Sequence, residues 1–480
     1  MPTFLLSCAA ERFSVAAHVG DPTSGRTGAR VSEVHSDLKN TLVLLDSGDE
    51  QLAIVTSPLG IECREMHSAI CAALAETLGL RPQQVFGATS HDHCVPNCVD
   101  EAVFDWQKAP GLVRPGTINP LGQAFLAGLR TAALRVRSRL VPATLEWGKA
   151  NETRITFNRR GRRPDGRPYF IREEDRLLLD PSYTGEIDPE ATVAVFRGAD
   201  RRPIAALAFF TGHPVTAYNP ERMIVWGEWP QVACEQLSAR LDGAPVAFLQ
   251  GCAGNINSRY MLGGTVAQSR ELGGFLGDAF EHAVALARPS LQPGLRRHVT
   301  TVQLPLAPLP SVAALQKDLA EIDEFIRRGQ AGDPTALECV GMNFPRALTP
   351  SYRAKLVEMI RPWFVHSLQE HHEGRAHLAP RALPVEIVVA RIGDIGLVGL
   401  PFEPFVQTGL KIKREAPLPC VLPCGYTNAS HGYIPDATAC DDREYMAGFF
   451  RYTAGRPPFA APAGDVAADA AVAILEQLSQ

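Results

Sequence analysis

Two histidines two positions apart are the residues of this sequence with the clearest capacity for chemistry. His91 and His93 follow residues 84–88, a short apolar run that is typical of a β-strand. Side chains at positions i and i+2 of a strand point to the same face, so we expect both imidazoles to converge where the strand ends. Imidazoles on a loop that a rigid strand holds can bind a metal or transfer a proton. The alternative is that the pair caps a buried strand by hydrogen bonding, and the two histidines alone leave this open.

Two further polar residues follow apolar, strand-like runs. His213 comes after residues 204–210, and Glu403 comes after residues 395–398. A loop histidine is often structural, and a carboxylate at the start of a helix is favoured by electrostatics alone. Two histidines and one carboxylate, with room for water, are nevertheless the ligand set of catalytic zinc. The combination therefore predicts a metal site, provided that the strand ends meet.

The elements that must position these residues alternate between strands and helices. Apolar runs predict strands, and apolar residues at helical spacing predict helices. The expected strands are residues 41–46, 52–56, 84–88, 145–148, 191–197, 204–210, 244–250, 385–389, 395–398 and 421–422, and the expected helices are 65–79, 119–140, 230–241, 265–287, 312–329, 352–369 and 464–478. This order predicts an α/β fold, with mixed β-sheets flanked by helices and a site at the strand ends.

We expect a single domain over residues 1–480, with one long polar segment inside it. Residues 150–190 are rich in Arg, Asp, Gly and Pro, which predicts a surface excursion, and loops of this length are usually functional or mobile. The alternative for this segment is a disordered insertion. A second loop, residues 251–257, carries two glycines after a strand, so its backbone N–H groups could face a ligand.

The composition argues against several classes of protein. Hydrophobic residues make up 45% and charged residues 21% of the 480 residues, which is ordinary for a soluble globular protein. The formal net charge is −5 and no dense basic stripe is present, so neither nucleic acid nor an anionic membrane is the expected partner. A small-molecule substrate is therefore expected, and a homo-oligomer is compatible with the sequence.

The expected location is the cytoplasm. The N-terminal residues lack the basic and apolar regions of a signal peptide, and no apolar run is long enough to span a membrane. The 11 cysteines are odd in number and spread along the chain, which is unlike a secreted disulfide framework.

Five segments, in the same order along the chain, resemble motifs of the neutral ceramidase family. They are Ala88-Thr89-Ser90-His91-Asp92-His93 (similar to A-T-H-T-H-S-G-P), Thr211-Gly212-His213-Pro214 with Trp226-Gly227-Glu228-Trp229, residues 248–257 (similar to Q-x-x-x-G-D/N-x-S-P-N), Leu400-Pro401-Phe402-Glu403-Pro404 (similar to P-G-E-x-T), and Gly432-Tyr433-Ile434-Pro435 followed by Glu444-Tyr445 and Arg451-Tyr452. The resemblance covers nearly the whole chain. It implies the fold of the neutral ceramidase catalytic domain and a zinc-dependent hydrolase acting on a C–N bond.

The resemblance also implies the metal ligands. By this likeness His91, His213, Glu403 and Tyr433 would bind one Zn²⁺ per chain, and His93 would lie beside the metal and donate a hydrogen bond to a developing oxyanion or to the bound water. Another divalent metal is compatible with a histidine and carboxylate set. The alternative for Tyr433 is a tyrosine that packs under a turn.

Other residues follow from the same likeness. Arg159 belongs to an Asn-Arg pair similar to one in the family, and its guanidinium could hold a carboxylate or an oxyanion. Asn257 stands where the family's loop carries a serine and Ser258 falls one residue later, so metal-activated water is expected in place of a serine nucleophile, with Asn257 as an amide donor. The expected substrate-binding residues are Arg160, Gly254, Asn255 and Tyr445. Cys94 could be a ligand or a reactive thiol, although free cysteine is usually a small buried hydrophobe.

Ceramidases proper carry a secretory signal and a C-terminal immunoglobulin-like domain, and neither is expected here. The sequence also shows no amphipathic element suited to a membrane surface, so a soluble small molecule is a better expected substrate than ceramide. The leading interpretation is an amide hydrolase that uses zinc-activated water. An ester or lactone hydrolase on the same metal site, a metal-dependent lyase or isomerase, and a non-catalytic binding protein of the same fold stay open.

Overall fold

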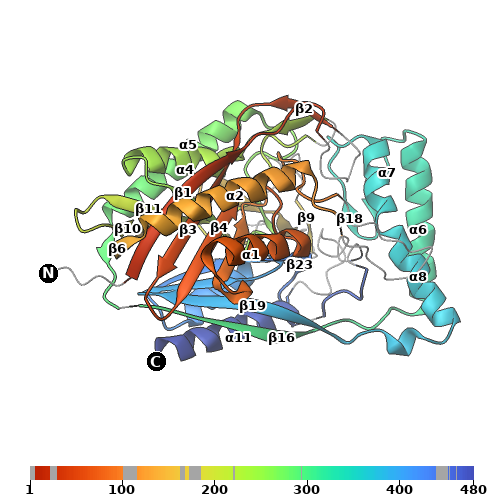
Figure 1. Ribbon diagram of the computed structural model, residues 1–480. Helices are drawn as coiled ribbons and strands as arrows, with labels where there is room; N and C mark the ends of the chain where they lie inside the picture. The colour runs from red at the N-terminus through yellow and green to blue at the C-terminus, as the bar shows by residue number, and fades with distance from the viewer. Residues whose placement is uncertain are drawn as a thin grey trace.

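The computed structural model describes most of the chain. The described residues are 6–21, 30–100, 116–162, 168–171, 185–219, 222–292, 294–438, 452, 455–460 and 462–480. They form two main β-sheets with helices on their outer faces (Figure 1). The predicted mixed sheets with flanking helices are therefore confirmed, while the expectation of a single domain stays a prediction.

The larger sheet has nine strands and is bent. Its order is β13-β11-β10-β6-β1-β3-β4-β5, with β15 beside β6. The strands are β1 (Leu6–Val15), β3 (Leu38–Asp46), β4 (Gln51–Ser57), β5 (Val85–Thr89), β6 (Val141–Asn151), β10 (Glu190–Arg197), β11 (Pro203–Phe210), β13 (Val246–Gln250) and β15 (Arg288–Pro289). Three residue pairs, residues 6–8 with residues 141–143, join β1 to β6 in the described chain. The sheet curves enough that its two edge strands, β5 and β13, lie close to each other.

The smaller sheet has four strands and packs against the inner face of the larger one. Its order is β16 (Leu295–Pro305), β19 (Ala382–Ile392), β20 (Ile395–Gly399) and β22 (Cys420–Cys424). Alternate apolar residues of both sheets share one core, to which Val43, Phe209 and Leu397 belong. Helices cover the other face of each sheet, so most of these strands are buried on both faces and their sequences are continuous apolar runs.

Helices cover the outer faces of both sheets. The helices are α1 (Arg64–Leu78), α2 (Pro120–Arg139), α4 (Glu228–Arg240), α5 (Val266–Ala285), α9 (Val406–Glu415) and α11 (Ala463–Ser479). Apolar side chains of α1 and α2 pack on β1, β3 and β4, whereas those of α4 and α5 pack on β10, β11 and β13. The helices α9 and α11 cover the smaller sheet. No helix in the described ranges is both long enough and apolar enough to cross a membrane.

Three more helices stand at one end of the molecule (Figure 1) and are called the cap here. The cap consists of α6 (Val312–Gln330), α7 (Pro350–Glu358) and α8 (Arg361–His372), and it has its own apolar cluster. Its chain leaves the end of β16 and returns at the start of β19, two strands that pair with each other. The single helix predicted over residues 352–369 is wrong: it is two helices, because Pro362 lacks an N–H and its ring clashes with the preceding turn.

Short strands and turns complete the described chain. They are β2 (Val31–Val34), β7 (Thr156–Asn158), β8 (Arg160–Arg162), β9 (Pro168–Phe170), β12 (Met223–Val225), β14 (Ile256–Ser258), β17 (Glu338–Cys339), β18 (Met342–Asn343), β21 (Glu403–Pro404) and β23 (Tyr433–Ile434), with 3₁₀ turns at Pro82–Gln84 and Ala376–Leu378. Three parallel pairs are functionally important: β4 with β5, β11 with β13, and β20 with β22. Parallel strands end at the same edge, so the loops that follow them meet.

Residues 150–190 were predicted to form a surface excursion, but part of this segment is buried. The prediction is wrong for that part. Ile155 is fully buried and Arg159 is 3% exposed. β7 pairs with β14, and the backbone N–H of Arg159 donates to Asn255 O (2.8 Å). A polar segment can be buried when distant parts of the chain supply its hydrogen bonds, as they do here. Residues 163–167 and 172–184 of this segment lie outside the described residues.

Candidate metal centre

Three side chains meet where strands of the two sheets end. His91 follows β5, His213 follows β11, and Glu403 follows β20. Glu403 Oε2 lies 3.3 Å from His91 Nε2 and 3.4 Å from His213 Nε2. The centroids of the two imidazole rings are 5.1 Å apart. The structure thus brings together the two histidines and the carboxylate that the sequence combined.

The other ring nitrogen of each histidine, Nδ1, lies within hydrogen-bond distance of an oxygen atom. His91 Nδ1 lies 3.1 Å from Glu62 Oε1, and His213 Nδ1 lies 3.0 Å from Ile256 O. A carbonyl and an ionised carboxylate can only accept, so each Nδ1 carries a proton and each Nε2 is the ring nitrogen that faces Glu403.

This donor set fits a zinc ion. Glu403 Oε2 is buried and has no partner of hydrogen-bond geometry among the described residues, although two nitrogen atoms lie near it. Lone pairs that face one another repel unless a cation or a proton lies between them. Two histidines whose Nδ1 protons are held by oxygen, together with a carboxylate, are typical of zinc sites.

The electrostatics of the metal-free centre agree with this reading. Burial alone lowers the pKa of His91, but Glu403 and Glu62 raise it to about 9. Burial, followed by the charge of Arg159, lowers the pKa of His213 to about 4. Burial alone raises the pKa of Glu403, but His91 and His213 bring it well below its usual value. The carboxylate is therefore ionised and His213 is neutral, which are the forms that bind metals, whereas His91 carries a second proton that a metal ion would have to displace from Nε2.

His93 supplies a third imidazole. Its ring centroid lies 5.1 Å from that of His91 and 5.9 Å from that of His213. One nitrogen from each of the three rings falls within 4.8 Å of the others, so His93 is also able to reach a metal. The expectation that His93 lies next to the metal without binding it stays a prediction.

The convergence of His91 and His93 does not arise from strand alternation. β5 ends at Thr89, and His91 lies beyond it with φ +58°, in the left-handed region. Asp92 is buried and its Oδ1 accepts from the backbone N–H of Cys94 (2.7 Å), which holds the loop. The two imidazoles therefore meet because the loop turns sharply.

Cys94 takes no part in the centre. It is 1% exposed, burial raises the pKa of its thiol well above the usual range, and its Sγ donates to Glu228 Oε1 at 3.5 Å. Ser258 is likewise turned away, because its hydroxyl donates to Tyr260 O (3.0 Å). Neither side chain faces the metal ligands.

Gln250, at the end of β13, ties the two histidine loops together. Its side-chain Nε2 donates to Ser90 O (2.8 Å) and Gly212 O (2.6 Å), while its Oε1 accepts from the N–H of Gly212 (3.1 Å). The side chain is fully buried. The relative positions of His91 and His213 thus depend on the approach of strands β5 and β13.

Arg159 and Tyr433 lie at the edge of the centre. Arg159 donates to Tyr433 Oη (2.8 Å), Asn257 Oδ1 (2.9 Å) and Gly254 O (2.7 Å). Tyr433 pairs with Glu403 in the short parallel ladder of β21 and β23. Asn257 therefore orients Arg159, while Arg159 orients the phenol oxygen of Tyr433.

Three of the four expected substrate-binding residues lie within the described residues. Gly254 permits the loop after β13 to touch the Glu403 backbone, because a Cβ there would lie 2.5 Å from Glu403 O. Asn255 is fully buried and bonds to Gln407 and to the N–H of Val406, which leaves it a structural role. The Arg160 guanidinium bonds to Thr438, away from the described cavity wall. Tyr445 lies outside the described residues.

A cavity of about 140 Å³ opens beside the centre and is called the substrate cavity here. Its polar residues include His93, Arg159, Glu403 and Tyr433. Its apolar wall comes largely from the cap and the segments around it. That wall contains Phe170, Val215, Met261, Leu262, Met342, Phe344, Pro345, Leu348, Leu356 and Met359. One end of the cavity is thus polar and the other is apolar.

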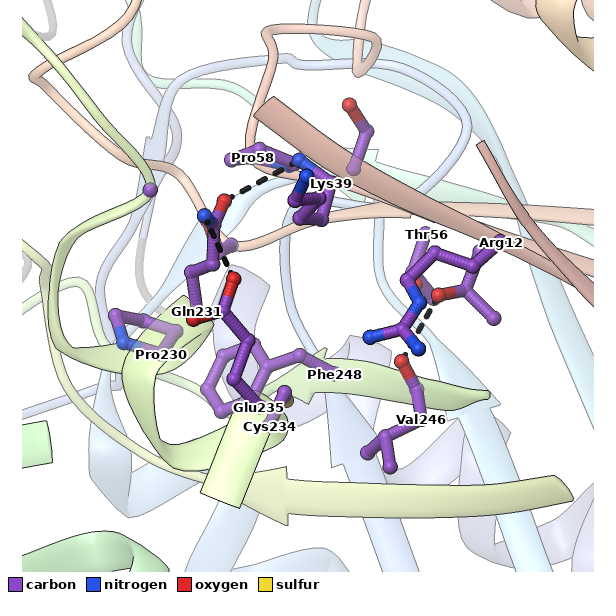
Figure 2. Close-up of a pocket in the computed structure, with 14 residues that line it drawn as sticks. Arg12, Lys39, Thr56, Pro58, Pro230, Gln231, Cys234, Glu235, Val246 and Phe248 are labelled. Carbon is purple, nitrogen blue, oxygen red and sulfur yellow. Dashed lines mark hydrogen bonds between the residues drawn. The ribbon is translucent and has the colours of Figure 1, made fainter. Parts of the chain in front are cut away.

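A second, smaller cavity lies between α4 and strands β1, β3 and β4 (Figure 2). Its volume is about 40 Å³, which is room for a few water molecules. Figure 2 shows Gln231 between Lys39 and Glu235, with its amide bonded to the Lys39 N–H and to Glu235 Oε1 (both 3.2 Å). Neither His91, His213 nor Glu403 is among the residues that line this cavity.

The sequence interpretation missed two residues of the centre. Glu62 holds His91 Nδ1, and Tyr426 stacks on the His91 ring with a centroid distance of 4.2 Å and an angle of 26°. Tyr426 is the second residue after β22, so the strand-end rule that found Glu403 could have found it too. Glu62 lies five residues beyond β4, and only the three-dimensional path of that loop brings it to His91.

Two solved structures share this fold. The neutral ceramidase from Pseudomonas aeruginosa has a TM-score of 0.65 and 18% sequence identity, over 99% of this chain and 75% of that one. A ceramidase complexed with C2 has a TM-score of 0.64 and 17% identity, over 99% of this chain and 76% of that one. No protein-family model and no curated protein matches the sequence. The expected neutral-ceramidase-like fold is confirmed.

Proposed function

We propose that the protein is a zinc-dependent hydrolase that cleaves an amide bond of a small molecule with an apolar acyl group. The observation that carries this proposal is the position of Glu403 Oε2, within 3.4 Å of the Nε2 atoms of both His91 and His213. The likeness of the fold to ceramidases, whose substrates are amides, supports the reaction class. In this proposal Tyr433 is the fourth protein ligand.

When bound, Zn²⁺ supplies a Lewis acid that polarises a carbonyl and lowers the pKa of water. The residues of the chain do the rest. Arg159 places a positive charge at the cavity wall, where it stabilises the oxygen that becomes negative as the amide carbon turns tetrahedral. His93, at the same wall, donates a proton from a ring nitrogen to the leaving amine.

The substrate cavity indicates an apolar acyl group. Its wall is dominated by aliphatic, aromatic and methionine side chains, and a charged acyl group would lose its hydration there without compensation. Tyr218 and Tyr352, whose hydroxyls lie 3.3 Å apart, are the polar groups of the cap side. We therefore propose an uncharged acyl chain on a soluble amine, in preference to ceramide.

Metal analysis together with a substrate panel tests this function. We expect about one zinc per chain, and hydrolysis of N-acyl amino compounds that a chelator abolishes and zinc restores. In H₂¹⁸O the released carboxylate should carry one ¹⁸O atom. The panel includes matched esters and lactones, ceramide in detergent, and the His213→Ala variant as a control. Product without ¹⁸O would reassign the protein to a lyase or isomerase, and absence of bound metal would refute the proposal.

A further inference from the structure

The backbone of His91 does not by itself determine where its ring points. Its φ of +58° lies in the left-handed region, which residues other than glycine rarely adopt. The backbone N–H donates to Thr89 Oγ1 (3.0 Å), which fixes the loop but not the side-chain torsions. A ligand at such a position needs other contacts to hold its ring.

Glu62 supplies the first of these contacts. Its Oε1 lies 3.1 Å from His91 Nδ1, and both side chains are about 85% buried. This contact retains the proton on Nδ1 and leaves Nε2 free for a metal. The corresponding partner of His213 Nδ1 is the neutral carbonyl of Ile256. Of these two imidazoles, that of His91 therefore has the anionic Nδ1 partner and is the stronger donor.

Tyr426 supplies the second contact, from the other sheet. Its ring stacks on the His91 ring at 4.2 Å, and its Oη lies 3.5 Å from His213 Nε2. Tyr426 is 1% exposed and follows β22 of the smaller sheet, whereas Glu62 follows β4 of the larger one. The imidazole is therefore held at one nitrogen by one sheet and across its face by the other.

We infer that Glu62 and Tyr426 are positioning residues that hold the His91 imidazole with Nε2 toward Glu403. The inference rests on the metal site of the proposed function. It goes beyond that function because it makes metal affinity depend on two residues that do not touch the metal. Partners of this kind typically change metal affinity by about 10–100-fold.

The first test is Glu62→Gln, which keeps the shape of the side chain and removes its charge. We expect Zn²⁺ affinity, measured by competition with a chelating dye, to fall about 10–100-fold. The visible absorption spectrum of the Co²⁺-substituted protein should shift, while the unfolding temperature in chelator stays within about 2 °C of wild type. The matched control is Glu76→Gln on α1, whose side chain is 68% exposed and pairs with Arg130. This control should leave both affinity and spectrum unchanged.

The second test separates stacking from the hydroxyl of Tyr426. Tyr426→Phe keeps the ring on His91 and should leave Zn²⁺ affinity within about threefold of wild type, whereas Tyr426→Leu should lower it roughly tenfold. Equal affinities for the Leu variant and wild type would remove Tyr426 from the inference.

The outcomes distinguish this inference from the proposed function. A wild-type protein that binds no metal contradicts the proposed function. Stoichiometric wild-type zinc with unchanged affinity and Co²⁺ spectrum in Glu62→Gln overturns the role of Glu62 and leaves the function standing. If Glu62→Gln does not fold, Glu62→Asp keeps the charge at a shorter reach. A folded Asp variant with wild-type affinity would then overturn the role, and a weakened one would support it.

Discussion

The metal centre and the apolar wall of the substrate cavity are built in opposite ways. The centre collects polar side chains from the ends of strands in both sheets, and directional hydrogen bonds place them. Gln250 joins the two histidine loops through their backbones, and Glu62 holds the His91 ring. The wall comes largely from the cap and its neighbours, whose contacts are apolar and non-directional. Directional contacts fail when one atom moves, whereas apolar contacts fail gradually. Single substitutions should therefore abolish the chemistry in the centre and only adjust selectivity in the wall.

The largest effect is expected from loss of a metal ligand. His213→Ala removes one nitrogen from the centre, so we expect loss of stoichiometric zinc and a fall in kcat/KM of roughly 10³-fold or more, because metal catalysis supplies several kcal/mol. Metal analysis and steady-state kinetics measure both quantities. If the variant kept its full metal content, the centre would tolerate the loss of a side chain as the wall does, and the proposed difference between the two regions would be wrong.

His93→Gln tests whether the third imidazole belongs to the metal or to the proton transfer. We expect zinc to be retained and kcat to fall about 10²–10⁴-fold, the usual contribution of a general acid or base. Loss of zinc instead would make His93 a ligand, which the close approach of the three imidazoles also allows.

Arg159→Lys keeps the positive charge but removes the planar fork that reaches Tyr433, Asn257 and Gly254. We expect zinc content to be unchanged and kcat to fall about 10²-fold, the lower end of the cost of losing one oxyanion donor. Wild-type kinetics would show that charge alone suffices at this edge of the centre.

The smallest effect is expected in the wall. Leu348→Ala removes apolar contacts at the apolar end of the substrate cavity. Because a bulky acyl group loses these contacts, its KM should rise about tenfold, while kcat for an acetyl substrate and the zinc content stay unchanged. The control is Leu378→Ala, a leucine that is 66% exposed. A large fall in kcat for both substrates would show that the wall also positions the reacting groups.

The sequence predicted those parts of the centre that depend on local pattern. His91, His213 and Glu403 each follow an apolar strand, which made them candidates. That these strands end close together depends on pairing that the sequence left open. Arg159 was expected from the family resemblance, but its burial was not, because it depends on β14 and on carbonyl groups far along the chain.

The cap shows a different limit of sequence reasoning. Helical periodicity predicted α6 and the region of α7 and α8, since each helix buries one apolar stripe. A periodic stripe does not say which element it packs against, so the apolar wall of the cavity was not foreseen. Pro362 at the start of α8 was the local sign that residues 352–369 form two helices, because proline favours the first turn of a helix.

The pairing of β16 with β19 has a consequence for how this fold could diversify. The two strands form eleven residue pairs, so the ends of the intervening chain are held side by side by the sheet itself. The cost of closing a loop grows only slowly with its length, so this segment can be exchanged or resized without disturbing the sheet. Reaction type and substrate choice are thus separable traits. An engineer could graft a new specificity onto an unchanged reactive centre by replacing one continuous stretch of chain.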